Sequence, residues 1–291
     1  MFVINPISYP GNKNKLVKYI QPYIPSNLDT FVDVFCGSAV VAVNSSAKKI
    51  ICNDISIDTI QILKYFYSTN FEAILSSLES IIFSYNLTYS RIKPKGFYKE
   101  IKHEGLSIYN KNSYNKLKQD YNDDKTIDKL IILLIYGFNH YIRFNSKGRF
   151  NIPVGKVDFS KSIYTNLKKF VTEIKKLNIK FSTKDFRNKN LYLNKRAFYY
   201  FDPPYLITSA PYNNKWNEKD EKDLFEILDS LNKSNTKFAL SNVLTSNGKR
   251  NHLLIEWSKK YNIINMHRQY RNANYQKINI EDTKEVLITN Y

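Results

Sequence analysis

The segment with the clearest chemical potential is the tetrapeptide Asp202-Pro203-Pro204-Tyr205. It follows an apolar, aromatic run at 197–201, whose length and β-prone residues predict a buried strand. The two prolines cannot continue a strand ladder, so we expect the strand to end there in a rigid turn. A carboxylate and a backbone carbonyl in this turn can accept the two hydrogens of an exocyclic amine, and a tyrosine ring can stack on a flat base. The alternative is an ordinary strand end at which Tyr205 only packs.

A second candidate site lies in residues 30–39, where a predicted strand is followed by a tight turn and a helix that begins near Val40. The turn is similar to the glycine-rich turn that binds nucleotides, although it contains a single glycine. A further predicted strand ends at Asp54, about 20 residues on, where Rossmann-like units place a ribose-binding acid. The alternative is that Asn53 or Asp54 caps a helix. The residues of interest in the first turn are Asp33, Phe35, Cys36 and Gly37.

Two loops offer further polar groups. Residues 8–15 form a turn-rich loop in which Gly11 and Lys13 could present backbone amides and a cation to a carboxylate. This loop lacks the second glycine and the Lys-Ser/Thr pair of a P-loop, and it could be a simple N-terminal turn. Residues 138–155 mix aromatic, amide and arginine side chains, and Ser146-Lys147-Gly148 predicts the tip of a hairpin. Such a mixture suits base edges, phosphates and an unstacked base step, whereas the alternative is an ordinary surface hairpin.

Composition narrows the class of protein. The chain has 291 residues, of which 43% are hydrophobic, so a packed core is expected. Lysine and arginine number 44 against 26 acidic residues, and the net charge of +18 favours a polyanionic partner, although an AT-rich genome could also supply the lysines. Two cysteines without zinc-finger spacing and four scattered histidines predict no metal site. We expect no signal peptide and no membrane span, and hence a cytoplasmic protein.

Strands that alternate with helices predict an α/β sheet. Further strands are expected near 179–182, 237–242, 261–266 and 285–289, and helices near 16–20, 57–85, 127–136, 161–176, 218–231 and 251–259. Residues 89–124 are polar and rich in asparagine, lysine and tyrosine, and no element is assigned to them here. Because 59–159 lacks the alternation, the sequence predicts a catalytic domain at 1–58 and 160–291 with an inserted domain at 59–159.

Taken together and in order, these motifs resemble the Dam-type (class alpha) DNA adenine-N6 methyltransferases over nearly the whole chain. The resemblance implies a Rossmann-like S-adenosylmethionine-dependent methyltransferase sheet with an inserted, mostly helical target-recognition domain that bears a β-hairpin. It implies double-stranded DNA as the substrate, in a bacterial or phage-encoded enzyme. Ser8 stands where GATC-specific members have a lysine, and Ala39 stands where a second glycine is usual. The recognition sequence, a cognate restriction endonuclease and the oligomeric state stay open.

The resemblance also implies roles for individual residues. Asp202 to Tyr205 would be catalytic, with Asp202 and Asp33 also at the cofactor, and the acid at Asp54 would hold the ribose hydroxyls. Asp185 and Phe186 would enclose the adenine of the cofactor. The methionine end of the cofactor would lie against Tyr9, Gly11, Lys13, Phe35, Cys36 and Gly37. The DNA-reading residues would be Phe138, Asn139, Tyr141 and Arg143, to which the composition of the hairpin adds Asn145, Lys147 and Arg149.

A mechanism follows from the tetrapeptide. The amino lone pair of adenine is delocalised into the ring, and hydrogen bonds from the amine to Asp202 and the Pro203 carbonyl would localise it. The base would have to be flipped out of the duplex to reach this turn, with Tyr205 stacking on it. The alternatives are a non-catalytic nucleic-acid-binding regulator of the same fold, a cytosine-N4 methyltransferase, and an enzyme that methylates RNA or protein glutamine.

Overall fold

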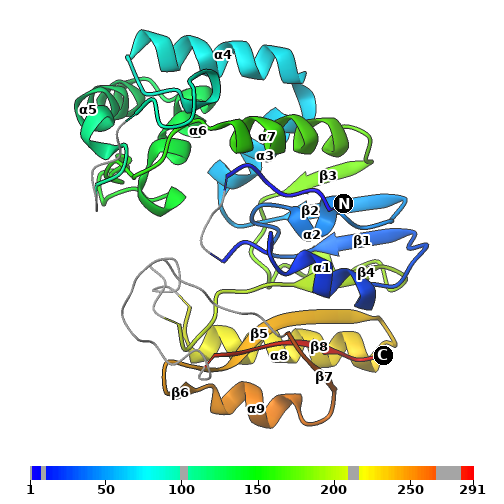
Figure 1. Ribbon diagram of the computed structural model, residues 1–291. Helices are drawn as coiled ribbons and strands as arrows, with labels where there is room; N and C mark the ends of the chain where they lie inside the picture. The colour runs from blue at the N-terminus through cyan, green and yellow to red at the C-terminus, as the bar shows by residue number, and fades with distance from the viewer. Residues whose placement is uncertain (1, 8–10, 99–103, 209–215, 267–282) are drawn as a thin grey trace. The chain divides into compact units, whose positions relative to one another are not determined.

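The computed structural model describes residues 2–7, 11–98, 104–208, 216–266 and 283–291, and the chain divides into two compact units. The sheet unit comprises residues 15–56 and 178–291, and the helical unit comprises residues 1–14 and 57–177 (Figure 1). The helical unit therefore includes the first 14 residues and the helix that starts at Lys161, which the sequence-based division assigned to the catalytic domain. The assignment of functions to these parts remains a prediction.

The described residues of the sheet unit contain a mixed sheet of eight strands, seven of which follow the order β3-β2-β1-β4-β5-β8-β7 while β6 pairs with β5. The five strands from β3 to β5 in this order are parallel, and the pairs β5–β8, β7–β8 and β5–β6 are antiparallel. The predicted α/β class is thereby confirmed, and the sheet is mostly parallel. The strands are β1 (Thr30–Asp33), β2 (Lys49–Asn53), β3 (Ile179–Ser182), β4 (Phe198–Phe201), β5 (Phe238–Ser246), β6 (Lys249–Arg250), β7 (Asn262–Asn265) and β8 (Lys284–Thr289).

The strand order reverses direction between β1 and β4. Val32 of β1 pairs with Ile51 of β2 on one side and with Tyr199 of β4 on the other. The chain winds outward from β1 to β2 and β3, and then returns to form β4 and β5 on the other side. In open α/β sheets, ligands bind beyond the carboxyl ends of the strands at such a reversal. The ends of β1 and β4 are therefore where a site is expected.

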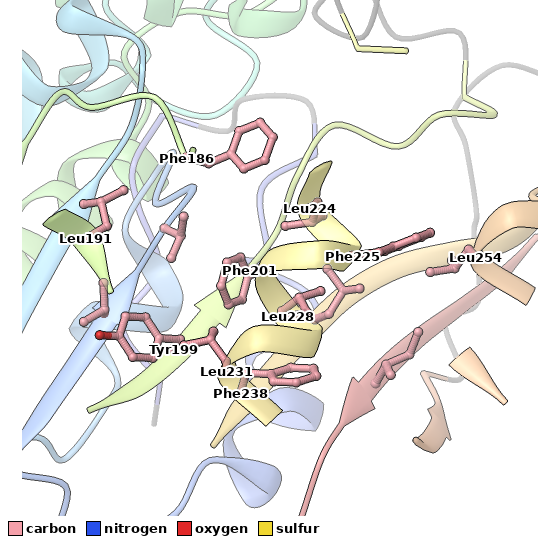
Figure 2. Close-up of a cluster of buried hydrophobic side chains, with 14 of the residues drawn as sticks. Phe186, Leu191, Tyr199, Phe201, Leu224, Phe225, Leu228, Leu231, Phe238 and Leu254 are labelled. Atoms are coloured by element: carbon pink, nitrogen blue, oxygen red, sulfur yellow. The ribbon is translucent and has the colours of Figure 1, made fainter. Parts of the chain in front are cut away.

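One face of the sheet packs against the helices α8 (Glu218–Lys233) and α9 (His252–Ser258). Because side chains alternate along a strand, Tyr199 and Phe201 point to this face and pack with leucines of α8 (Figure 2). Helix α8 begins at a capping box, in which Asn217 accepts a hydrogen bond from the Asp220 N–H and Asp220 accepts one from the Asn217 N–H. The other helices in the described part of this unit are α1 (Val17–Ile20), η1 (Gln21–Tyr23), α2 (Val40–Val43) and η4 (Lys189–Leu191).

The helical unit is built around α6 (Ile127–Tyr136), whose residues from Leu130 to Tyr136 are all buried. The helix contacts α4 (Phe71–Ser84) and α5 (Ser107–Asp123). The described residues of this unit also form α3 (Ile57–Ser68), η2 (Ser90–Ile92), η3 (Phe138–His140) and α7 (Lys161–Ile174). The helices expected at 57–85, 127–136 and 161–176 are confirmed. No helix of the described residues is long and apolar enough to cross a membrane.

Helix α5 lies in the polar segment 89–124, to which the sequence analysis assigned no element. Its buried residues are spaced as on one face of a helix, but two of the four are Tyr114 and Tyr121 and a third is Asn110. The Asn110 side chain accepts a hydrogen bond from the Thr88 N–H at 2.8 Å and donates one to Thr88 Oγ1 at 2.9 Å. Because Asn110, which pairs with Thr88 outside the helix, and two tyrosines occupy the inward face, hydropathy alone does not reveal this helix.

Candidate active site

The Asp202 turn lies at the carboxyl end of β4. Pro203 is buried, and the Tyr205 hydroxyl turns back toward the Asp202 carboxylate. This hydroxyl lies 3.1 Å from Asp202 Oδ1 and 3.2 Å from Glu285 Oε1. Since a phenol has one proton to donate, the two carboxylates share it. The predicted turn thus includes an acid from another part of the chain.

Glu285 reaches the turn because β5 is longer than β4. Phe201, the last residue of β4, pairs with Leu240, whereas β5 continues to Ser246. The first residues of β8 pair with this extension, and Glu285 lies opposite Val243 with 4% of its surface exposed. The sequence reasoning treated Glu285 only as the start of a strand. The signal was an acid directly before the apolar run at 286–288.

Two tyrosines of this region, Tyr200 and Tyr205, remain neutral. Burial, followed by the negative charges of Asp202 and Glu285, raises the pKa of Tyr205 well above its usual value. Burial and then the charge of Asp202 raise the pKa of Tyr200 in the same direction. The Tyr200 hydroxyl lies 2.7 Å from Ser241 Oγ on the sheet face opposite α8. At neutral pH neither tyrosine can therefore supply a base, and the Tyr205 hydroxyl can orient the two carboxylates that it contacts.

The turn after β1 is joined to the end of β2 through Asp54. The Gly37 N–H donates to Asp54 Oδ2 and the Ser56 N–H donates to Asp54 Oδ1, each at 2.9 Å. Burial raises the pKa of Asp54, and these two hydrogen bonds act in the opposite direction. A carboxylate has about four acceptor positions, so Asp54 retains capacity for further donors.

The backbone conformation of this turn favours glycine at position 39, where the similar methyltransferases usually have one and this chain has Ala39. Gly37 has φ +45°, and Ala39, which directly precedes α2, has φ +55° and ψ +19°. A left-handed conformation costs an ordinary residue about 1–2 kcal/mol. Ala39 keeps the turn geometry at that cost.

Two further predicted residues lie in or near this turn. Asp33, the last residue of β1, is buried. Cys36 and Cys52 are buried thiols, and burial raises the pKa of Cys36 well above its usual value. A thiol of this kind is inert, so Cys36 serves as a small apolar group.

An aromatic cluster lies beside the turn. The ring centroids of Phe35 and Phe186 are 5.4 Å apart, and Trp216 lies 5.9 Å from the first and 5.3 Å from the second. Arg187 lies over the Phe186 ring at 4.3 Å and is hydrogen-bonded to the carboxylates of Asp185, Asp220 and Asp223. The sequence reasoning found Asp185 and Phe186 but missed Trp216 and Arg187, whose partners lie in α8.

The residues predicted from the N-terminal loop lie in the other unit. Lys13 is buried in the helical unit, and its Nζ donates to the Gly11 carbonyl at 3.0 Å. Tyr9 lies outside the described residues, as does Ser8. The sheet unit therefore holds every other predicted catalytic or cofactor-binding residue, and the contribution of Tyr9, Gly11 and Lys13 stays a prediction.

The segment 137–155 folds back on itself within the helical unit. In its described residues the antiparallel pairing consists of two isolated bridges, Gly137–Val154 and Phe144–Phe150. Asn145 Oδ1 accepts hydrogen bonds from the N–H groups of Lys147 and Arg149, each at 3.0 Å, so Asn145 shapes the turn itself. The exposed Arg149 also pairs with Asp123 of α5 at 3.0 Å.

Arg143 already has partners on the opposite arm of this segment. Its Nε donates to Asn151 Oδ1 at 2.8 Å and its Nη2 donates to the Asn151 carbonyl at 3.3 Å. Nearby, Phe138, Asn139 and Tyr141 line an open pocket of about 380 Å³. Phe138 is 46% exposed, and Asn139 is in the left-handed region with φ +53°.

The described residues contain no group of three or more histidine, cysteine, aspartate or glutamate side chains that could hold a metal ion.

Residues 9–272 match the sequence model of the D12 class N6 adenine-specific DNA methyltransferases. The chain belongs to this family. The resemblance found in the sequence is thereby confirmed.

Several characterised proteins are similar to this D12 class chain. The Type II methyltransferase M.FokI of Planomicrobium okeanokoites is 36% identical over 100% of the chain and 43% of its own length. The modification methylase StsI of Streptococcus sanguinis is 32% identical, again over 100% of the chain and 43% of its own length. The Type II methyltransferase M.MjaIII of Methanocaldococcus jannaschii is 26% identical over 81% of the chain and 83% of its own length. The chain thus spans less than half of the first two relatives.

Proposed function

We propose that this chain is a site-specific DNA methyltransferase that moves a methyl group from S-adenosylmethionine to the N6 amine of a flipped adenine in double-stranded DNA. The observation that carries the proposal is the Asp202 carboxylate, which the Tyr205 hydroxyl orients at the end of β4 beside the strand-order reversal. Membership of the D12 class family supports the adenine amine as the acceptor.

The donor set of the sheet unit fits S-adenosylmethionine. Asp33, Asp54 and Asp202 place negative charge near the ends of β1, β2 and β4, which suits a cationic cofactor with hydroxyl groups. Phe35 and Phe186 supply apolar rings for a flat base. Once bound, the sulfonium group would supply an activated methyl group.

The protein residues then act on the acceptor amine. Asp202 and the Pro203 carbonyl accept its two hydrogens, which concentrates the lone pair on N6 and opposes delocalisation into the ring. The Tyr205 hydroxyl holds one oxygen of Asp202, so the carboxylate presents its other oxygen to the amine. Alignment and electrostatics suffice, and no covalent bond between enzyme and base is needed.

We further propose that the helical insertion recognises the target and that the segment 138–155 acts as its reading hairpin. Exposed aromatic and basic side chains at Phe138, Arg143 and Lys147 support this assignment. Phe138 would wedge into the step that the flipped adenine leaves, while Lys147 and Arg149 would contact phosphates. The terms "Type II methyltransferase" and "modification methylase" in the names of the relatives favour a cognate restriction endonuclease as a biological partner.

Nucleoside mass spectrometry tests the proposed reaction directly. Unmethylated DNA incubated with the protein and S-adenosylmethionine should yield N6-methyladenine, and sequencing of modified bases should place it in one short motif. N4-methylcytosine would indicate the cytosine alternative. DNA that is bound but not methylated would indicate a non-catalytic regulator.

The net charge of +18 predicts a strong salt dependence of DNA binding. Phosphate contacts release counterions, so the DNA affinity should fall at least about tenfold between roughly 50 and 200 mM salt. Fluorescence anisotropy with a labelled duplex measures this slope, and cofactor binding in the same buffers is the control. An affinity that does not change with salt would argue against DNA as the partner.

Replacing Arg143 with alanine should relax selectivity at one base pair. A guanidinium can bond both acceptors on the major-groove edge of guanine, so we expect a loss of about 1–3 kcal/mol on the cognate site. Methylation rates on duplexes with single base-pair changes measure the effect. Lys147→Ala is the matched control, because loss of a phosphate contact should weaken all sequences equally.

The bonds from Arg143 to Asn151 define the competing outcome. If Arg143 only braces the two arms, both Arg143→Ala and Asn151→Ala should lower the melting temperature and slow methylation of every duplex by the same factor. That result would remove Arg143 from the reading residues.

A further inference from the structure

The Tyr205 hydroxyl is held from two sides, by Asp202 of its own turn and by Glu285 of a distant strand. We propose that Glu285 is a positioning residue, which acts through Tyr205 to set the orientation of the Asp202 carboxylate. The inference rests on the proposed methyltransferase function and adds a residue to its site.

The backbone of Glu285 is held firmly in the sheet. Its backbone lies between two neighbouring strands, because it pairs with Val243 of β5 and its carbonyl accepts the N–H of Met266 at 2.9 Å. Its side chain is buried on the sheet face that also carries Tyr200 and Ser241. Asp202, in contrast, follows the last residue of β4. The contact therefore ties a strand end to the interior of the sheet.

The shared proton gives Glu285 a chemical effect as well as a steric one. If Tyr205 donated to Asp202 alone, that hydrogen bond would shorten and would withdraw electron density from the carboxylate that must accept the amine. Competition from Glu285 weakens this donation and keeps Asp202 a better acceptor. The second contact also restrains the ring, whose face is needed for the flipped base.

A purely structural role would not require a charge at this position. Burying a carboxylate is costly, and replacing a buried charge with a neutral group of similar shape is often neutral or stabilising. We therefore expect Glu285→Gln to melt at or above the temperature of the unsubstituted protein. A slower reaction in an equally stable protein separates positioning from folding.

The test is a double-mutant cycle on the single-turnover methylation rate at saturating cofactor and DNA. Glu285→Gln and Tyr205→Phe should each slow the reaction about tenfold, since each removes part of a charge-assisted hydrogen bond. The double variant should match Tyr205→Phe within about twofold, because Glu285 acts through the hydroxyl that is already absent. Values of KM for cofactor and DNA should change much less than kcat.

Two more variants complete the design. Glu285→Asp keeps the charge, but its side chain is one methylene shorter and should not reach Tyr205, so its methylation rate should also be low. A full rate in this variant would overturn the inference. Glu256→Gln, an exposed residue of α9, is the matched control and should be unaffected. The positioning role would be overturned if the rate losses of the two single variants multiplied in the double variant. It would also be overturned if the Glu285→Gln protein were both slower in methylation and lower in melting temperature than the unsubstituted protein. An unsubstituted protein that binds DNA without methylating it would overturn the proposed function and this inference with it.

Discussion

Asp202→Ala is expected to lower the single-turnover rate of methyl transfer by at least about 10²-fold, which is the scale for removing one preorganised group from a transition state. The amine would lose one of its two acceptors, and the positive charge that develops on N6 would lose its nearest carboxylate. Asp202 is only one of three acids proposed near the cofactor, and the Asp54 contacts to Gly37 and Ser56 do not involve it, so cofactor affinity should be largely retained. Rapid-quench measurement with labelled cofactor gives the rate.

Two further variants serve as comparisons for Asp202→Ala. Asp202→Asn keeps the shape and one oxygen acceptor, so it should retain more activity than the alanine variant. Asp29→Ala removes an exposed carboxylate that pairs with Lys48 in the same unit and should leave the rate unchanged. A near-normal rate in Asp202→Ala would show that the carboxylate does not contact the reacting amine.

Asp54→Ala is expected to weaken S-adenosylmethionine binding by about 1–3 kcal/mol, the cost of leaving paired polar groups without partners. The variant would strand the ribose hydroxyls and would also release the N–H groups of Gly37 and Ser56, which Asp54 holds in the turn. Titration calorimetry measures the affinity. An unchanged affinity would place the ribose elsewhere.

The direction of the Asp54 pKa shift adds a pH test to this experiment. Burial raises the pKa of Asp54, so its carboxyl takes up a proton at a higher pH than an ordinary aspartate. The cofactor would bind the ionised form, and its affinity should therefore fall as the pH is lowered toward that raised pKa. Asp54→Asn should bind weakly and lack this dependence on pH.

Local sequence patterns predicted the strand ends and turns on which the candidate site is built. The run at 197–201 ends in two prolines, so the strand and its turn follow from neighbouring residues alone. The turn at Gly37 and the acid at Asp54 are likewise defined by a short strand–turn–helix pattern. These features need no knowledge of the rest of the fold.

The residues that sequence reasoning missed depend on pairing between distant segments. Glu285 joins the site only because β5 extends past β4 and β8 pairs with that extension, a register that no local pattern reveals. Trp216 and Arg187 likewise depend on contacts between loops and helix α8, since Trp216 donates to Glu221 and Arg187 to Asp223. Helix α5 was missed for a different reason, since its buried face includes Asn110, Tyr114 and Tyr121.

The position of β8 has a consequence for folding. This strand lies between β5 and β7 in the sheet, although it follows both of them in the chain, and Glu285 is 80 residues from Tyr205. Contacts between residues so far apart require a large loss of chain entropy before they form, and they slow the assembly of a sheet. A partly folded chain could therefore have β1 to β5 and the complete Asp202 turn while the Tyr205 hydroxyl still has only one carboxylate. The insertion of β8 would complete the sheet and the site in the same step.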